Sequence, residues 1–276
     1  METEKFNDLT KTQFEAVNHT EGPVLVVAGP GSGKTRVLAY RIYNLIKNHQ
    51  VSTENLLAVT FTNKAAQEMR ERCENLLKGF SKLNIYTFHS LSAFLLRSYG
   101  SKIGIEPTFS IYDSDDQLRL VKRILKNLNR DPKLLPFKIN TLISEISLAK
   151  NLKLSPTQYI NKFGDQNSSI GFNQNVFEMY QNYENELIQS NALDFDDLLL
   201  KTVTLLQNDE ETRMMCEEQF KYLLVDEFQD TNKLQFEIST SLTKENKNLF
   251  VVGDPDQSIY SWRHADPNNV IDFNNF

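Results

Sequence analysis

The stretch Ala28-Gly29-Pro30-Gly31-Ser32-Gly33-Lys34-Thr35 decides the fold. An apolar run, Val24–Val27, precedes it, and a helix-like run at 37–46 follows it. This order of strand, loop and helix is the setting of a phosphate-binding loop, because glycines let several backbone N–H groups face one anion and the helix N-terminus adds partial positive charge. Lys34 can reach the outer phosphates of a nucleotide, and the Thr35 hydroxyl can ligate Mg²⁺. The stretch therefore predicts a nucleotide-binding site.

One position of the loop departs from the strict glycine pattern. Ala28 stands where the pattern has its first glycine. Alanine is small enough for that place, so the departure weakens the prediction little. The alternative is a glycine-rich turn between a strand and a helix, and it does not account for the triplet Gly33-Lys34-Thr35.

The composition is that of a folded protein without an export signal. Of the 276 residues, 40% are hydrophobic and 24% are charged, which is ordinary for a globular domain. The net charge of −6 argues against a generally basic nucleic-acid binder and leaves room for a local basic groove. Cys73 and Cys216 lie far apart and outside any metal-ligand spacing, so we expect free thiols in a reducing compartment. The polar N-terminus and the lack of a long apolar run predict a cytoplasmic protein without a membrane partner.

Short apolar runs alternate with amphipathic helical patterns on both sides of a central region. The predicted strands are Val24–Val27, Leu56–Thr60, 85–88, Tyr222–Val225 and 249–252. Strands that alternate with helices predict an α/β fold with a parallel sheet and helices on both faces. Ligands of such sheets bind at the carboxyl ends of the strands. Phe61 and His89 follow two of these ends, although a buried aromatic and a structural histidine are the alternatives.

Residues 108–190 lack strands of this kind and show helical periodicity. They predict an all-helical insertion domain between residues 1–107 and 191–276, with a loop at 161–175 before a helix at 176–189. Its first half has a basic bias, which suits either a phosphate-facing surface or a solvated helical face. The basic residues are Lys122, Arg123, Lys126, Arg130, Lys133, Lys138, Lys150 and Lys153.

Two carboxylates follow the predicted strand Tyr222–Val225. Asp226 at the strand end can hold the Mg²⁺ that Thr35 also contacts. Glu227 is placed to orient or deprotonate an attacking water. A loop carboxylate pair without chemistry is the alternative, but together with the phosphate-binding loop the pair predicts an NTPase.

Polar and aromatic residues also follow the last predicted strand. Gln257 lies where it can contact the terminal phosphate, which makes it a candidate for coupling the nucleotide state to its neighbours. Tyr260 and Trp262 lie close by. Stacking of an aromatic ring on a base is worth about 1–3 kcal/mol and tolerates any sequence, so these rings suit a protein that grips nucleic acid. A core position is the alternative for Trp262.

These segments together resemble superfamily 1 DNA helicases of the UvrD/Rep/PcrA type over essentially the whole chain. Residues 9–17 resemble the adenine-reading Q motif, 28–35 motif I, 60–66 motif Ia, 87–90 the next DNA-contacting motif, 194–198 a further family element, 225–231 motif II and 252–263 motif III. The resemblance implies a RecA-like ATP-binding domain in two segments, 1–107 and 191–276, around the insertion.

The resemblance also implies a role for each matching residue. The ATP-binding set would be Gln13, Ala28, Gly29, Pro30, Gly31, Ser32, Gly33, Lys34, Thr35, Arg36 and Arg263. The catalytic set would be Lys34, Asp226, Glu227 and Gln257, with Thr35 and Asp226 on Mg²⁺. The DNA-binding set would be Thr60, Phe61, Thr62, Asn63, His89, Tyr260 and Trp262. Gln257 and Arg263 would link the ATP site to the DNA.

The function implied by the resemblance is that of an ATP-dependent 3′-to-5′ DNA helicase or translocase with ATP and Mg²⁺ as cofactors. Its partners would be single-stranded DNA, junctions of single- and double-stranded DNA, and repair or replication proteins. The family motor needs a second RecA-like domain carrying motifs IV to VI, which have no counterpart in these 276 residues. We therefore expect an N-terminal portion that needs this domain in cis or in trans, hydrolyses ATP weakly or not at all, and does not unwind DNA alone.

Two other functions are compatible with the phosphate-binding loop. One is a nucleotide-gated module that binds single-stranded DNA without turnover. The other is a small-molecule kinase with a phosphate-binding loop, which leaves the aromatic residues at three strand ends unexplained.

Overall fold

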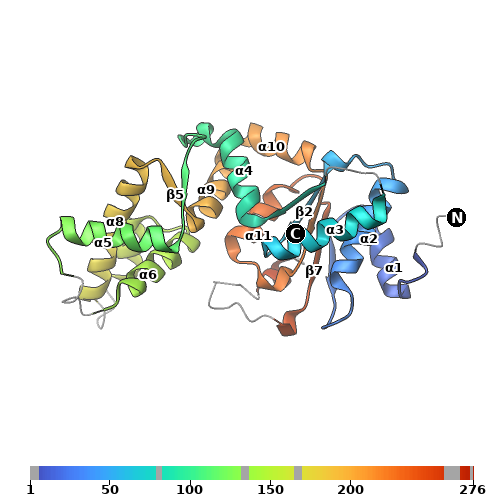
Figure 1. Cartoon of the computed structure of the whole chain (residues 1–276), viewed down its shortest axis with the longest axis horizontal. Helices are drawn as coiled ribbons and strands as arrows, with labels where there is room; N and C mark the ends of the chain where they lie inside the picture. The colour runs from blue at the N-terminus through green and yellow to red at the C-terminus, as the bar shows by residue number, and fades with distance from the viewer. Residues whose placement is uncertain (1–5, 79–82, 132–136, 165–169, 258–267, 274–275) are drawn as a thin grey trace. The chain divides into compact units, whose positions relative to one another are not determined.

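The computed structural model describes residues 6–78, 83–131, 137–164, 170–257, 268–273 and 276 (Figure 1). The chain divides into two compact units. The first unit combines Met1–Ser92 with Leu205–Phe276, and the second unit is Ala93–Thr204. The second unit thus begins before the predicted boundary at 107/108 and ends after the one at 190/191.

The first unit is built on a five-stranded parallel sheet of order β1-β7-β6-β2-β3. The strands are β1 Val24–Val27, β2 Leu56–Thr60, β3 Asn84–Thr87, β6 Tyr222–Val225 and β7 Leu249–Gly253. Every residue of β2 and β7 is buried, as expected for apolar strands inside a parallel sheet. The predicted α/β fold with a parallel sheet is confirmed.

Helices α1 Lys11–Asn18, α2 Lys34–Lys47 and α3 Asn63–Leu77 lie beside one another, α1 on α2 and α2 on α3 (Figure 1). The apolar face of α2 packs with residues of α3 and the sheet in one core. The remaining α-helices of the unit are α10 Glu210–Gln219, α11 Lys233–Ser241 and α12 Asn268–Asp272. Short 3₁₀ helices are η2 Thr53–Asn55, η5 Phe228–Asp230 and η6 Pro255–Gln257.

The sequence of residues 9–17 predicts a short helix that Thr10 or Thr12 could cap, with Phe14 and Val17 pointing inward. The structure differs from this prediction in one side chain. Thr10 caps α1, and Val17 is fully buried, as predicted. Phe14 was expected to point inward as well, but 43% of it is exposed. This expectation was wrong: the Phe14 ring packs against Phe6 in an edge-to-face arrangement, at 5.9 Å between ring centroids, but it stays outside the core to which Val17 belongs.

The second unit consists mainly of helices around a core of their own. They are α5 Ser114–Asn127, α6 Ile139–Asn151, α7 Pro156–Phe163 and α8 Ile170–Gln189, with η3 Gly100–Ile103. Helices α4 Phe88–Tyr99 and α9 Phe195–Asn208 run across the limits of the units. Leucine and isoleucine side chains of α5 and α6 pack with tyrosines of α8 in this core.

Two details of the predicted insertion are wrong. It is not all-helical, because β4 Ser110–Tyr112 pairs in parallel with β5 Ala192–Asp194. Strands of three residues are too short to show a period of two in the sequence. The predicted loop at 161–175 also runs too far, since α8 begins at Ile170. Asn173 belongs to this helix and is buried, and its amide donates to the Phe163 carbonyl at 2.6 Å.

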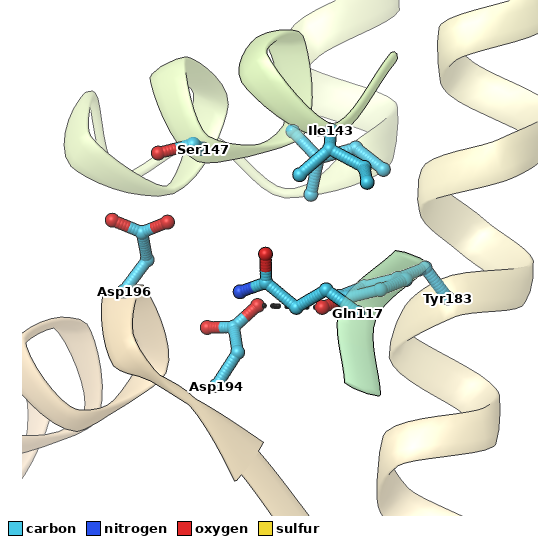
Figure 2. A pocket seen from close by; sticks show the side chains of 7 residues that line it. Gln117, Ile143, Ser147, Tyr183, Asp194 and Asp196 are labelled. Atoms are coloured by element: carbon cyan, nitrogen blue, oxygen red, sulfur yellow. Dashed lines mark hydrogen bonds between the residues drawn. The ribbon is translucent and has the colours of Figure 1, made fainter. Parts of the chain in front are cut away.

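A buried ion cluster lies in the second unit. The Lys150 ammonium is fully buried and lies 2.9 Å from Glu184, 2.9 Å from Asp194 and 2.8 Å from Asp197. The Tyr183 hydroxyl donates to Asp194, as Figure 2 shows beside a small cavity. Lys150 therefore does not belong to a basic surface. The acidic stretch at 194–198 predicts a helix start, but Asp194 and Asp197 also form ion pairs with Lys150.

The charges of this cluster shift the pKa values of its carboxyl groups. Burial, followed by the charge of Asp194, raises the pKa of Asp197 to about 7. Burial alone would also raise the pKa of Asp194, but the Lys150 charge holds it below its usual value. Two of the other predicted basic residues are paired as well, Arg123 with Glu186 at 2.8 Å and Arg130 with Glu178 at 2.6 Å. The basic bias of the sequence is thus partly neutralised within the unit.

Cys73 and Cys216 are free thiols, as predicted, and both are buried. Burial raises the pKa of each to about 12. Within the described ranges, no helix has both the length and the apolar character needed to cross a membrane.

Candidate nucleotide-binding site

The predicted phosphate-binding loop connects β1 to α2. Gly31 and Gly33 have φ angles of +70° and +82°, in the left-handed region that favours glycine. Gly33 caps α2 without a side chain, so backbone N–H groups stand at the helix N-terminus. The Ala28 N–H donates to the Gly253 carbonyl at 3.0 Å and continues the pairing of β1 with β7. The fold therefore supplies the exposed turn and helix terminus that bind an anion.

Lys34 lies between two carboxylates at the ends of neighbouring strands. Its Nζ atom is 3.9 Å from Glu227 after β6 and 3.7 Å from Asp254 after β7. Only 10% of the Lys34 side chain is exposed. The ammonium is thus held at the carboxyl edge of the sheet, next to the loop.

Thr35 and Asp226 also lie together. The Thr35 hydroxyl donates to Asp226 Oδ2 at 3.4 Å, and Asp226 is buried. Burial and the neighbouring charge of Glu227 raise the pKa of Asp226 to about 6, against the opposing effects of Thr35 and Lys34. A divalent cation stabilises the ionised form of a carboxylate that is buried and lies beside another negative charge.

This pair fits the predicted Mg²⁺ site. Mg²⁺ is commonly bound through one or two protein ligands together with waters and substrate phosphates. In the part of the chain that the structure describes, no cluster of three or more His, Cys, Asp or Glu side chains could hold a metal ion by itself. Thr35 and Asp226 are the residues that would hold the cation with a nucleotide.

Glu227 takes an unusual backbone conformation directly after β6. Its φ angle is +49°, in the left-handed region. Its carboxylate accepts a hydrogen bond from Gln229 Nε2 at 2.8 Å and lies near Lys34. About a third of the side chain remains exposed, which leaves room for a water to meet it.

Gln229 and Asp254 are site residues to which the sequence reasoning assigned no role. Both are buried. Gln229 Oε1 accepts from the Asp254 backbone N–H at 2.8 Å while its Nε2 donates to Glu227. Asp254 also accepts a hydrogen bond from the Gln257 side chain. The sequence shows polar residues after each of the two predicted strands. It does not show that these strands are neighbours in the sheet, which is needed to predict that Gln229 and Asp254 meet.

Gly253 leaves the space that Gln229 fills. A Cβ atom at Gly253 would lie 2.8 Å from Gln229 Oε1 and 3.2 Å from the Gln229 backbone nitrogen. We expect Gly253→Ala to push Gln229 away from Asp254 and to lower the free energy of unfolding by about 1–3 kcal/mol, as overpacking does. Urea unfolding followed by circular dichroism measures this change.

Gly171→Ala is the matched control, since a Cβ there meets nothing within 4 Å. Its stability should stay equal to that of the wild type or rise slightly, because alanine favours a helix. Equal urea midpoints for Gly253→Ala and the wild type would contradict the close packing of Gln229.

Gln13 and Arg36 lie at the loop. Gln13 Nε2 donates to the Ser32 carbonyl at 2.7 Å, and its Oε1 accepts from the Thr10 N–H at 2.9 Å and from Arg36 at 3.3 Å. Arg36 also donates to the Asp8 carbonyl. The structure thus brings the predicted adenine-reading residue, Gln13, and the predicted ATP-binding residue Arg36 to the phosphate-binding loop.

The predicted DNA-contacting residues fall into different environments. Phe61 and His89 are half-buried after the ends of β2 and β3, where Thr60 and Thr87 are paired in register. Thr60 itself is fully buried and donates to the Thr62 carbonyl at 3.1 Å, so it braces the strand end.

Thr62 and Asn63 are exposed at the start of α3, where the Thr62 hydroxyl caps the helix. Tyr260, Trp262 and Arg263 lie outside the described residues, so their predicted roles have no structural counterpart here.

The parallel sheet, the loop before α2 and the Thr35–Asp226 pair define a P-loop NTPase domain of the RecA-like kind. The sequence profile of the UvrD/REP helicase N-terminal domain matches residues 9–276. The chain belongs to the UvrD/REP helicase family.

Three curated relatives are each named ATP-dependent DNA helicase PcrA. The protein of Leuconostoc citreum is 44% identical over 269 residues, which cover 97% of this chain and 35% of the relative. The protein of Bacillus subtilis (strain 168) is 43% identical over 266 residues, 96% of this chain and 35% of the relative. The protein of Staphylococcus aureus (strain NCTC 8325 / PS 47) is 43% identical over 268 residues, 97% of this chain and 36% of the relative. The chain thus spans about a third of the length of these relatives.

Proposed function

We propose that this chain binds ATP with Mg²⁺ and single-stranded DNA as the N-terminal motor portion of a 3′-to-5′ DNA helicase or translocase. The observation that carries the proposal is the arrangement of Lys34, Thr35 and Asp226 at one edge of the parallel sheet. The PcrA relatives are named ATP-dependent DNA helicases, and the matched region is about a third of their length.

The side chains of the site divide the chemistry among themselves. Backbone N–H groups of the loop bind phosphate oxygens, and Lys34 exchanges its carboxylate partners for the outer phosphates. Thr35 and Asp226 would hold Mg²⁺, which neutralises charge on the phosphate oxygens when it is bound. Glu227 orients the attacking water and accepts its proton. Gln13 contacts the adenine, and Arg36 contributes to ATP binding beside it.

Asp254 connects the nucleotide site to the residues that follow β7. It lies beside Lys34 and accepts a hydrogen bond from the Gln257 side chain. When Lys34 leaves Asp254 for a phosphate, the negative charge of Asp254 is no longer compensated by Lys34, and the hydrogen bond from Gln257 to Asp254 is affected. We propose that Gln257 passes this change to Arg263 and to the base-contacting Tyr260 and Trp262.

The proposed partners are single-stranded DNA, its junctions with duplex DNA, and repair or replication proteins. A second motor domain, in cis or in trans, would complete the ATP site with arginines. The two free thiols fit a cytoplasmic location.

The rate of ATP hydrolysis distinguishes the proposed motor portion from the alternative, a module whose DNA binding is controlled by nucleotide. Both use the same binding residues. We expect the 276-residue chain to bind ATP and to hydrolyse it slowly, with and without single-stranded DNA. Fast DNA-stimulated hydrolysis by this chain would contradict the need for a second domain. Complete absence of hydrolysis, also after a second motor domain is added, would favour the gated module.

Phe61 offers a direct test of DNA binding. It follows β2 at the carboxyl edge of the sheet and is half-buried, so part of the residue is accessible. We expect Phe61→Ala to weaken binding of single-stranded DNA by about 5- to 150-fold, because stacking on one base is worth about 1–3 kcal/mol. Fluorescence anisotropy of a labelled oligonucleotide measures the affinity.

Phe195→Ala is the control for Phe61. Phe195 is also a partly exposed phenylalanine, at 43%, but it begins α9 rather than following a strand of the large sheet. DNA affinity of this variant, and ATP affinity of both variants, should match the wild type. If Phe61→Ala bound the oligonucleotide as tightly as the wild type does, the stacking role would be wrong.

A further inference from the structure

Arg41 of α2 is a buried arginine that the proposed chemistry does not use. Only 2% of its surface is exposed. Its guanidinium donates to the carbonyls of Val17 at 3.3 Å, of His19, and of Thr20 at 2.9 Å. These carbonyls lie at the C-terminal end of α1, where a helix leaves its carbonyl groups without partners and its dipole favours a cation. Arg41 therefore caps α1 from a neighbouring helix.

Other contacts hold the guanidinium in this place. It lies 4.7 Å from the centroid of the Phe250 ring in β7. Burial lowers the pKa of Arg41 to about 10, while the nearby Tyr222 and Glu21 raise it, so Arg41 keeps its charge at neutral pH. Glu21 accepts from the Tyr222 hydroxyl at 2.6 Å and from Asn248 Nδ2 at 2.9 Å. The segment after α1 is thus fixed to the sheet as well.

Asn44 adds a second donor one turn further along α2. Its amide donates to the Val17 carbonyl at 3.1 Å and to Asn18 Oδ1 at 3.4 Å. Asn44 is fully buried. Arg41 and Asn44 together form a clamp on the C-terminal end of α1.

The opposite end of α1 carries Gln13. Gln13 is fixed to the loop by its bond to the Ser32 carbonyl and meets Arg36 of α2. Helix α1 has eight residues, and a helix of this length is marginal without tertiary contacts. The position of Gln13 therefore depends on how α1 is held on α2.

We propose that Arg41, with Asn44, is a positioning residue for nucleotide selectivity: it holds α1 so that Gln13 meets the adenine base. This inference rests on the proposed binding of ATP. The groups proposed to bind the phosphates are the backbone N–H groups of the loop and Lys34 at the start of α2, and α1 contributes none of them. Loss of the clamp should therefore weaken recognition of the base and spare recognition of the phosphates.

The test compares ATP with GTP binding by the full 276-residue chain in the presence of Mg²⁺. Arg41→Met removes the donors and keeps an apolar stem over Phe250. We expect it to weaken ATP binding about tenfold, as expected for lost hydrogen bonds to the base, and to leave GTP binding within about twofold. Arg213→Met is the matched control, since Arg213 is a buried arginine paired with Glu217 in α10 of the same unit.

A double-variant cycle with Gln13→Ala shows whether Arg41 acts through Gln13. In the Gln13→Ala background, Arg41→Met should cost no further ATP affinity, because coupled residues are not additive. Additive losses, or equal losses for ATP and GTP, would show a merely structural role and overturn the inference. Asn44→Leu removes the smaller part of the clamp and should lower the ATP preference in the same direction if Arg41→Met does not fold.

The controls also separate this inference from the proposed function. A wild-type chain that does not bind ATP would overturn the proposed function, and the inference with it. A wild-type chain that prefers ATP over GTP, together with Arg41→Met and Asn44→Leu variants that keep this preference, would overturn the inference alone.

Discussion

Lys150→Met is expected to lower the free energy of unfolding of the second unit by about 3–5 kcal/mol, the cost of breaking a buried ion pair by removing one partner. Lys150 is fully buried and lies within 2.9 Å of Glu184, Asp194 and Asp197. Methionine has a similar length and no charge. Its substitution leaves these carboxylates without their cation in a place where charge is poorly solvated.

The loss should depend on pH in a defined direction. Without Lys150, the pKa of Asp197 rises further above its value in the unfolded chain, and the pKa of Asp194 is no longer held below its usual value. The folded state then binds more protons than the unfolded state, so stability increases as the pH falls. We therefore expect a larger gap between variant and wild type at pH 8 than at pH 5, measured by urea unfolding.

Lys122→Met is the control for this prediction. Lys122 is an exposed residue of α5, in the same unit, and its replacement should change stability by no more than about 0.5 kcal/mol. If Lys150→Met unfolded at the same urea concentration as Lys122→Met, the cluster would contribute nothing to the fold.

Lys34→Ala is expected to reduce ATP affinity by roughly 10- to 150-fold, since a hydrogen bond to a charged group contributes about 1.5–3 kcal/mol. Lys34 lies next to the loop, between Glu227 and Asp254. Its removal takes away the cation that would meet the phosphates and leaves two carboxylates that repel them. Calorimetric titration with ATP and Mg²⁺ measures the affinity.

Lys47→Ala is the matched control, because Lys47 is exposed at the other end of the same helix. It should bind ATP as the wild type does. The two carboxylates near Lys34 also predict a lower stability for Lys34→Ala, so folding is checked first by thermal unfolding. A folded Lys34→Ala variant with unchanged ATP affinity would disprove the assignment of the loop.

The central features of the first unit could be predicted because they are encoded locally. The phosphate-binding loop follows the apolar strand β1 directly, and β2, β6 and β7 are short runs of mostly buried apolar residues. The hydrogen bonds of Gln229 to Glu227 and Asp254 could not be predicted in this way. They exist because β6 and β7 are neighbours in the sheet, and strand order is a property of the whole fold.

The burial of Lys150 could have been predicted from its helical spacing in the sequence. Leu142, Ile146 and Ala149 are buried along α6, and Lys150 follows Ile146 by one helical turn. Its spacing therefore places Lys150 on the apolar face of the helix rather than on a basic surface. Its carboxylate partners come from α8 and from the segment at 194–197, so their meeting depends on tertiary packing.

The two contacts of Lys34 have a consequence for how ligands enter the site. When Lys34 turns toward a phosphate, Glu227 and Asp254 lose a shared cation close to Asp226. The triphosphate and these carboxylates then repel one another unless a divalent cation arrives with the nucleotide. Nucleotide and cation are therefore thermodynamically linked: each increases the affinity of the site for the other by the same factor.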